Sequence, residues 1–295
     1  MRRRAFLASL GTAVATAGCL AGGDSPGTDD RTPTTGTDPT TTPPGTDRPP
    51  APFTDTLTVG DTTLRFAGPV VQHSYFRLTT PDSMAVEVAD GQFCFVGVAV
   101  EDGSPPDPDA FALVVGEETY DLGTELGERV PYSVPVAAGD GRPYRTDEGA
   151  GWVAADVPAP IDEAEPLLRV SVGEETHDVT LPGHAADTLG DPAPAFTFGE
   201  VSAPESVAAD EPIPVEVPVT NEGDGPGTAR VVVNETGPMY APHQLETALD
   251  PGASETLTGS IDTHMNAGDG TGTVSFTVLA PGLESSHSVT ITGSA

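Results

Sequence analysis

The two cysteines and six histidines of this 295-residue chain are the side chains best suited to nucleophilic or metal chemistry. Cys94 lies between Phe93 and Phe95 in an apolar run. Such surroundings disfavour the thiolate, which is the reactive form of a cysteine. A free cysteine in this setting is typically a small buried apolar residue. We therefore expect Cys94 to belong to a core rather than to act as a nucleophile.

The histidines show no metal-binding spacing. They are His73, His177, His184, His243, His264 and His287. No HxH or HExxH pair occurs among them. Cys94 is followed by Phe95-Val96-Gly97-Val98, which excludes the closely spaced Cys, His and Met of a blue-copper centre. Histidines in turns and loops are usually solvated, and we expect that here. The alternative is a copper site in which His264-Met265, Met239 and His243 supply soft ligands. We therefore predict no metal and no cofactor.

Carboxylates and catalytic motifs give no enzyme signature. Asp102, Asp107 and Asp109 share one loop, but their spacing is not that of an EF-hand and intervening prolines constrain the chain. No GxSxG, Walker or GxGxxG element occurs. Trp152, the lone tryptophan, suits core packing better than a sugar-stacking platform. A non-enzymatic protein is the expectation.

The N-terminus carries the most specific pattern in the chain. Arg2, Arg3 and Arg4 precede a stretch of thirteen uncharged, mostly small or apolar residues, Ala5–Ala17, which is too short for a membrane span of about 20 residues but fits the apolar region of a signal peptide. With Phe6 and Leu7 following, the arginines resemble the twin-arginine export motif. That resemblance implies export of an already folded chain.

Thr16-Ala17-Gly18-Cys19 resembles the lipobox of lipoprotein precursors. The resemblance implies a signal peptide over residues 1–18 and a lipidated Cys19, which would hold the protein on the outer face of the cell membrane. Two chains on one sulfur can anchor a protein where a single chain cannot. One lipidated and one free cysteine also leave no pair for an intramolecular disulfide. The alternative is an ordinary secretory signal with an incidental cysteine.

Residues 19–52 are predicted to be a disordered tether. From Asp24 to Pro50 the sequence contains only Asp, Ser, Pro, Gly, Thr and Arg. Such a composition cannot bury enough apolar surface to offset the entropy of ordering. Its threonines among prolines resemble an O-glycosylated stalk.

The charge balance indicates that the protein works at high salt concentration. Twelve Lys+Arg, all arginine, stand against 45 Asp+Glu, a net charge of −33. So few cations argue against nucleic-acid binding. At molar salt the screening length falls to about 3 Å, which relieves the self-repulsion of such a chain. The lysine-free, acidic composition resembles proteins of salt-loving archaea; an acidic bacterial surface protein is the alternative.

Short strands separated by glycine and proline predict an all-β fold with two immunoglobulin-like sandwiches, at residues 53–183 and 196–295, joined by a linker at 184–195. Period-two alternation and apolar runs mark the strands. In the first sandwich they are 56–59, 63–66, 92–100, 111–115, 132–136, 152–157 and 167–172. In the second they are 215–220, 229–233, 257–261, 274–279 and 289–291.

The second sandwich has a family resemblance. Val215, Val217 and Val219 alternate and run into Asn221-Glu222-Gly223, with Leu249-Asp250-Pro251-Gly252 later. This pattern resembles the CARDB-type (cell-adhesion-related) immunoglobulin-like domains of prokaryotic surface proteins. The first sandwich is similar, more loosely, to immunoglobulin-like domains of archaeal lipoproteins. Both resemblances imply display or binding and transfer no catalytic residue.

Two further motifs are singled out. The segment 115–121 (VGEETYD) recurs as 172–178 (VGEETHD), which predicts two β-hairpins with the same turn chemistry rather than a repeated functional motif. Asn234-Glu235-Thr236 is an N-x-T sequon, so Asn234 is a glycosylation candidate on an exported protein.

These patterns predict a lipid-anchored, non-enzymatic surface protein of a halophilic archaeon. Its expected role is display, adhesion or contact with envelope proteins or glycans. The alternative is a substrate-binding or sensor lipoprotein that captures a small ligand or metal in its first domain.

Overall fold

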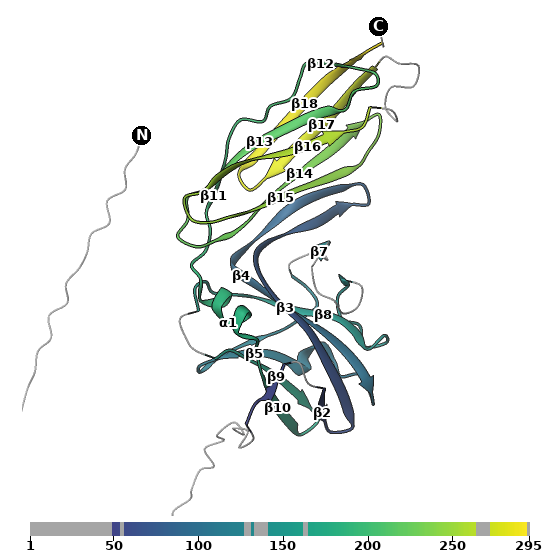
Figure 1. The fold of residues 1–295 in the computed structure, drawn as a ribbon. Coiled ribbons are helices and arrows are strands. Elements are labelled where there is room, and N and C mark those ends of the chain that lie inside the picture. The colour runs from purple at the N-terminus through teal and green to yellow at the C-terminus, as the bar shows by residue number, and fades with distance from the viewer. Residues whose placement is uncertain are drawn as a thin grey trace, which may run out of the picture. The chain divides into compact units, whose positions relative to one another are not determined.

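The computed structural model describes residues 49–53, 56–126, 131–132, 141–161, 165–263 and 272–293. All of them belong to one compact unit, Thr46–Ala295. The predicted all-β fold is confirmed: strands arranged in four sheets make up most of this part of the chain (Figure 1).

The first β-sandwich packs two sheets around one apolar core. One sheet has the order β1-β10-β9-β5-β6 and the other β2-β3-β4-β8, with β7 paired to β3. Their bounds are β1 Ala51–Pro52, β2 Leu57–Val59, β3 Thr62–Thr80, β4 Ser83–Asp102, β5 Phe111–Val115, β6 Glu118–Asp121, β7 Pro131–Tyr132, β8 Ala150–Val157, β9 Leu167–Val172 and β10 Glu175–Thr180. A short 3-10 turn, Pro108–Ala110, precedes β5.

Strand β4 is buried on both faces where it crosses this sandwich, as its apolar run predicted. Residues 92–98 are all buried. Because side chains alternate across a strand, Cys94 and Val96 enter the main core, while Phe93 and Phe95 pack on the other face. Trp152 joins that second cluster from β8, edge-on to Phe95 with ring centroids 5.4 Å apart.

The second β-sandwich is built from sheets β11-β13-β16 and β12-β18-β17-β14-β15. Its strands are β11 Phe196–Phe198, β12 Ser206–Ala208, β13 Ile213–Asn221, β14 Gly227–Gly237, β15 Pro242–Leu249, β16 Ser254–Ile261, β17 Gly272–Ala280 and β18 Leu283–Thr292. Along β13, Ile213, Val215, Val217 and Val219 are buried and the residues between them are exposed. This strict alternation places one face of the sheet on the core.

A long β-hairpin, formed by β3 and β4, leaves the first sandwich and reaches the second (Figure 1). Strand β8 pairs only with Gln92–Ala99 of β4, so residues 74–88, here named the hairpin arm, continue beyond it. Phe76 and Met84 of the arm form a small apolar cluster with Val232 of β14. The sequence pattern did not predict strand at 67–91, because this stretch shows neither clean alternation nor a continuous apolar run.

The hairpin changes register where the arm begins. Gln72 faces Phe93 and Ser74 faces Val88, so His73 alone lies opposite four residues of β4. At this irregularity a Cβ on Gly91 would sit 2.1 Å from the carbonyl oxygen of Val157, so the position requires glycine. Asp156 accepts hydrogen bonds from the amides of Asp90 and Gly91 at 2.9 and 3.2 Å, which holds the irregular segment against β8.

Helix α1, Gly183–Gly190, occupies much of the segment predicted as a linker. Leu189 is buried in the core of the first sandwich, and the carbonyl of Leu189 accepts a hydrogen bond from Gln92 at 2.9 Å. The eight-residue helix is too short for a periodic signal in the sequence.

The repeated VGEET segments form two hairpins with the same turn, as predicted. Val115 pairs with Glu118 and Val172 with Glu175, and Gly116 and Gly173 have φ of 60° and 61°. A glycine with positive φ at the first central position is typical of a type II′ hairpin turn. Strands β5 and β9 pair antiparallel, so the two turns lie at opposite ends of their sheet and do not form one site.

Candidate functional site

The N-terminal candidates lie outside the described residues. These are the export residues Arg2, Arg3, Arg4, Phe6 and Leu7, and the lipobox residues Thr16, Ala17, Gly18 and Cys19. The described chain starts at Pro49 and enters β1, which pairs in parallel with β10 at the edge of a sheet. No helix among the described residues is long and apolar enough to cross a membrane.

Cys94 is a core residue, as predicted. Its side chain is fully buried in the first sandwich, and desolvation raises the pKa of its thiol to about 12. The thiol therefore stays protonated at physiological pH and is a poor nucleophile.

Trp152 and Tyr144 are also buried core residues. Trp152 is fully buried, and its Nε1 donates a hydrogen bond to the carbonyl of Gly141 at 2.9 Å. Tyr144 is buried as well, packs against Phe111 and donates its hydroxyl to the carbonyl of Pro106 at 2.9 Å. Core packing is thus the role of Trp152, and neither ring is presented to a ligand.

Among the described histidines, His177, His243 and His287 each contact a different side chain. His243 Nε2 lies 2.6 Å from a carboxylate oxygen of the buried Glu235, and His177 Nε2 lies 3.7 Å from Glu175. His287 stacks on Phe276 with ring centroids 5.3 Å apart. His264 and Met265, the other half of the alternative copper site, lie outside the described residues.

Acidic residues of the 102–109 loop make no cation site in the part of the chain that the structure describes. Within that part no three His, Cys, Asp or Glu side chains are grouped closely enough to hold a metal ion. Asp102 and Asp107 are exposed, and Asp107 makes one long hydrogen bond, 3.5 Å, with Thr146.

Asn234, the glycosylation candidate, is buried at the junction of the two sandwiches. Its side chain is 6% exposed. Its Nδ2 donates to the carbonyl of Met84 at 2.8 Å, and its Oδ1 accepts from the amide of Met84 at 3.0 Å. A glycan is attached through Nδ2, so in the folded chain it would have to displace this hydrogen-bonded pair.

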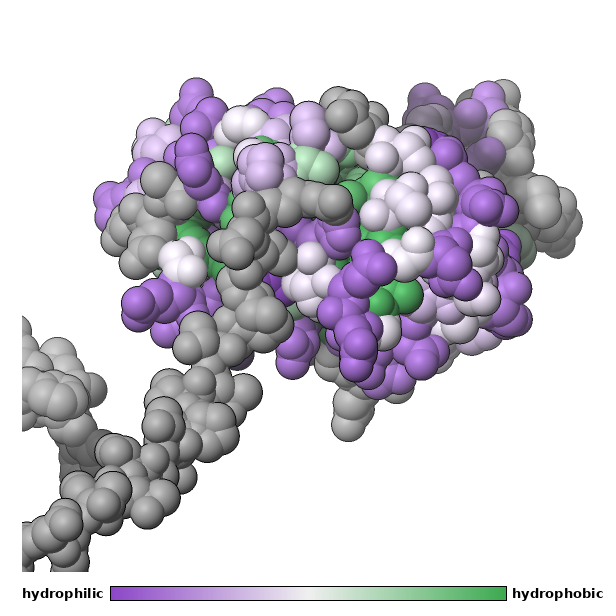
Figure 2. Space-filling model, turned by 90° about the horizontal axis from the view of Figure 1, so that it is seen from below, coloured by the Kyte–Doolittle hydropathy of each residue, from purple (hydrophilic) through white to green (hydrophobic). Residues whose placement is uncertain are grey.

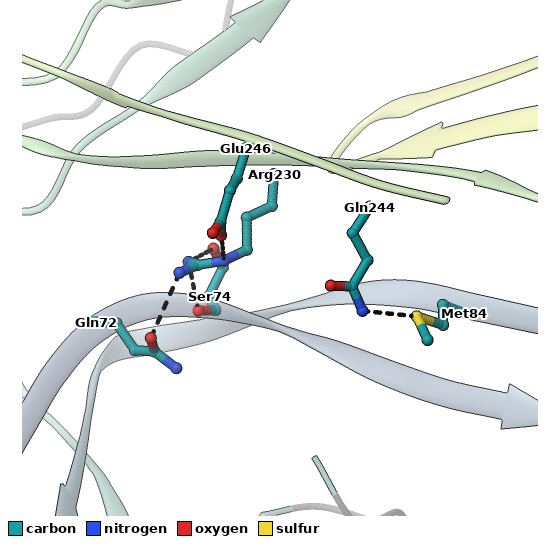
Figure 3. A network of polar contacts seen from close by, with 6 residues as sticks. All are labelled: Gln72, Ser74, Met84, Arg230, Gln244 and Glu246. Carbon is teal, nitrogen blue, oxygen red and sulfur yellow. Dashed lines mark hydrogen bonds and ion pairs between the residues drawn. The ribbon is translucent and has the colours of Figure 1, made fainter. Parts of the chain in front are cut away.

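Arg230 forms the centre of the same junction, which sequence reasoning missed (Figure 3). From β14 its guanidinium reaches the hairpin arm, where Nη1 donates to the carbonyl and hydroxyl oxygens of Ser74 at 2.7 and 3.0 Å. Nη2 donates to Oε1 of Gln72 at 3.4 Å, and Nε pairs with Glu246 at 3.2 Å. The guanidinium also lies 5.8 Å from the ring centroid of Phe76.

The electrostatics of Arg230 explain this set of partners. Burial lowers the pKa of the guanidinium, and Glu246 opposes that shift. An arginine still remains charged in proteins, so its donors need acceptors on every side. The only sequence signal was a charged residue inside the apolar strand 229–233, which a solvent-facing strand position would equally explain.

Among the open hollows on the described surface, two are considered as places that could receive a ligand. The first, about 570 Å³, lies on the first sandwich and is lined by Tyr75, Phe93 and five Asp or Glu side chains, among other residues. The second, about 500 Å³, is named here the junction hollow. Its lining is Val71, Gln72, His73, Thr188, Asp191, Pro226, Gly227, Thr228, Ala248, Leu249 and Asp250.

The surface around the first sandwich is mainly hydrophilic. Figure 2 shows polar residues over most of the visible face, with apolar residues in small separate patches. Among the described residues the exposed large apolar side chains are Val88, Met239 and Tyr240. No broad apolar surface is therefore evident in the described part of this face.

Comparison with known proteins gives no assignment. No family model and no curated protein matches the chain. A β-glucosidase from Erythrobacter marinus is 16% identical over 35% of this chain and 16% of its own, with a TM-score of 0.29. A β-glucosidase from Listeria innocua, in complex with glucose, is 20% identical over 35% of this chain and 17% of its own, with a TM-score of 0.28.

A protein of unknown function from Porphyromonas gingivalis W83 covers 77% of this chain and all of its own, at 14% identity and a TM-score of 0.18. The chain spans less than a fifth of the length of the two glucosidases. At these TM-scores the likenesses support no statement about activity or substrate.

Proposed function

We propose that the protein is a non-enzymatic, lipid-anchored surface protein of a halophilic archaeon. It presents two β-sandwiches outside the cell for display, adhesion or contact with envelope components. The observation that carries this proposal is the order of features in the sequence: basic residues, a short uncharged run, Thr16-Ala17-Gly18-Cys19, and then a tract without apolar side chains other than proline.

The tract is suited to act as a spacer. Asp24–Pro50 ends one residue before β1, so the tether leads directly into the first sandwich. Fully extended, its 27 residues reach at most about 90 Å at roughly 3.3 Å each. A coil is shorter, but it still holds a folded unit away from a lipid surface.

The folded part is suited to presentation as one body. Arg230, Asn234 and the cluster of Phe76, Met84 and Val232 tie the hairpin arm to the second sandwich. Contacts that are polar, buried and far apart in sequence resist independent motion of the parts they join. At molar salt the self-repulsion of a net charge of −33 is largely screened, so it does not oppose the compact folded state.

Replacement of Cys19 by serine tests the anchor, and Cys94→Ala is the matched control. Both variants are expressed in a halophilic archaeal host, and membrane and medium fractions are compared. Cys19→Ser is expected to be released or to accumulate unprocessed, because the lipidated sulfur is gone. Cys94→Ala keeps the proposed lipidation site and is expected to remain with the membranes.

Mass spectrometry of the N-terminal peptide completes this test. The proposal requires a peptide that starts at Cys19 and carries a lipid mass. A Cys19→Ser protein that fractionates with membranes as the parent does would show that another feature holds it there.

A ligand-binding or sensor lipoprotein is the second candidate function. It is favoured by the two open hollows of about 570 and 500 Å³, a size range typical of small-molecule sites. It is compatible with the same anchor and tether.

A further inference from the structure

The glycosylation sequon at residues 234–236 lies within a strand that has a neighbouring strand on each side. Asn234 pairs with Pro242 of β15 on one side and with Thr277 of β17 on the other. An N-x-T acceptor on an exported protein is expected in an accessible surface loop. The backbone of this sequon is instead held in the sheet β12-β18-β17-β14-β15.

Two of the three side chains of the sequon are buried. Asn234 and Glu235 are 6% and 5% exposed, and Thr236 is the exposed member of the triplet. The backbone amide of Glu235 donates to the carbonyl of Ala241 at 2.9 Å, and its carboxylate contacts His243 at 2.6 Å. The residues around the acceptor asparagine are therefore fixed by hydrogen bonds of their own.

The hydrogen bonds of Asn234 occupy the position at which a glycan would be attached. Nδ2 donates to the carbonyl of Met84 at 2.8 Å, and Oδ1 accepts from the amide of the same residue at 3.0 Å. A planar side-chain amide reaches one residue with both atoms through the Nδ2 hydrogen that lies on the side of Oδ1. A glycosylated amide prefers the trans form, in which the sugar on Nδ2 lies on that same side. The sugar would therefore replace the hydrogen that is donated to Met84.

The hairpin arm is the element that closes this position. Met84 belongs to the arm and packs on Val232 of β14 in a small apolar cluster. Arg230 of β14 holds the other strand of the arm through Ser74. A sugar ring is much larger than the hydrogen that it would replace, so it would displace Met84 from β14. A docked arm and a glycan on Asn234 therefore exclude each other.

We propose that docking of the hairpin arm closes the sequon, so that Asn234 carries no glycan in the exported protein. The proposal rests on the proposed surface location, because a sequon has meaning only on an exported chain. Export of an already folded chain, as the twin-arginine resemblance implies, would deliver the protein with its arm docked. Asn234 then acts as a hydrogen-bonding tie between the arm and β14, and not as an attachment site.

A second copy of the same triplet provides the matched control. Glu117 precedes Glu118 and Thr119, so Glu117→Asn creates the triplet Asn-Glu-Thr in the turn between β5 and β6. Residues 116–119 are exposed, and asparagine is favoured in turns. The two acceptor triplets then have the same sequence and differ only in their structural surroundings.

The Glu117→Asn chain, with its own N-terminal signal, is expressed in a halophilic archaeal host. Glycopeptides of the purified protein are then analysed by mass spectrometry. A glycan is expected at position 117 and none at Asn234. A glycan at Asn234 overturns the proposal. In the parent background, Thr236→Ala removes the sequon and should change the mass of the intact protein only by the difference between the two side chains.

Hydrogen exchange at the Met84 amide of the parent, in molar KCl, gives a second readout that needs no glycosylating enzyme. This amide donates to the buried Oδ1 of Asn234, so it should exchange at least about a hundredfold more slowly than an unstructured amide. If neither position 117 nor Asn234 carries a glycan, this rate decides: slow exchange supports the proposal. Exchange at the rate of an unstructured amide means that the arm is open and overturns it. Neither readout depends on Cys19, so this proposal and the lipid anchor fail separately.

Discussion

Asn234 and Met84, 150 residues apart, form a reciprocal pair in which one side-chain amide satisfies both backbone groups of a single residue. Oδ1 accepts from the Met84 amide at 3.0 Å, and Nδ2 donates to the Met84 carbonyl at 2.8 Å. The side-chain amide of Asn234 therefore makes the two hydrogen bonds that the backbone of a neighbouring strand would make. It joins the hairpin arm to β14 at a buried position. Only asparagine places both atoms correctly at this length.

Replacing Asn234 with Asp should destabilise the folded chain by about 1–3 kcal/mol, the typical cost of an unsatisfied buried group. The substitution keeps the acceptor but sets a carboxylate oxygen against the Met84 carbonyl. Thr236→Ala is the control, because it removes the sequon at an exposed residue and should change stability by less than about 0.5 kcal/mol. Denaturant unfolding in molar KCl measures both.

Arg230→Lys should also destabilise the chain by about 1–3 kcal/mol. Lysine keeps the charge but lacks the planar fork that reaches Ser74, Gln72 and Glu246 at once. Arg65→Lys is the matched control, because the Arg65–Glu101 pair is 2.8 Å long but exposed, with side-chain exposures of 57% and 42%. Its effect should stay below about 1 kcal/mol. Equal losses of unfolding free energy in the two variants would mean that the buried contacts of Arg230 contribute no more to stability than an exposed ion pair.

Sequence patterns predicted the elements whose surroundings are simple. The alternation along 215–220 and the apolar run 92–100 reflect strands with one or two buried faces, and burial of that kind determines the residue type directly. The Gly116 and Gly173 turns were equally predictable, because positive φ at one defined position demands glycine.

The junction could not be predicted in the same way. Arg230 and Asn234 occupy the outer face of β14, where a polar residue normally meets water. Their burial depends on a hairpin arm about 150 residues earlier, and no local pattern encodes that encounter. The junction hollow is likewise a product of tertiary packing, because its lining comes from segments that are far apart in the sequence.

Alkaline pH should weaken the fold through two buried tyrosines. Desolvation, with Glu87 as the next cause, raises the pKa of Tyr75 to about 12. Desolvation, with Asp107 next, does the same for Tyr144. Each folded pKa lies above the unfolded value near 10, so the stabilisation is complete below pH 10 and is lost as the pH rises toward 12.

Denaturant unfolding between pH 8 and 11.5 measures this loss, and absorbance near 295 nm follows tyrosine ionisation. Tyr75→Phe removes one of the two groups and should give a shallower decline above pH 10. A decline as steep as in the parent would show that Tyr75 does not contribute.

Counting the reactive thiols tests independently whether the sulfur of Cys19 is lipidated. The Cys94 thiol is fully buried with its pKa raised to about 12, so it should not react with a disulfide reagent while the chain is folded. In denaturant it becomes accessible and should react at once. The sequence holds two cysteines, so the number of thiols that appear on unfolding reports on the other one.

For protein purified from a halophilic host, one reactive thiol per unfolded chain is expected, because a thioether at Cys19 cannot react. Cys94→Ala should then give none, while protein made without its signal segment and retaining Cys19 should give two. Two thiols in the mature host protein would mean that Cys19 is free, and the lipid anchor would have to be abandoned. A rapid reaction before unfolding would mean instead that the first sandwich opens far more readily than its packed core implies.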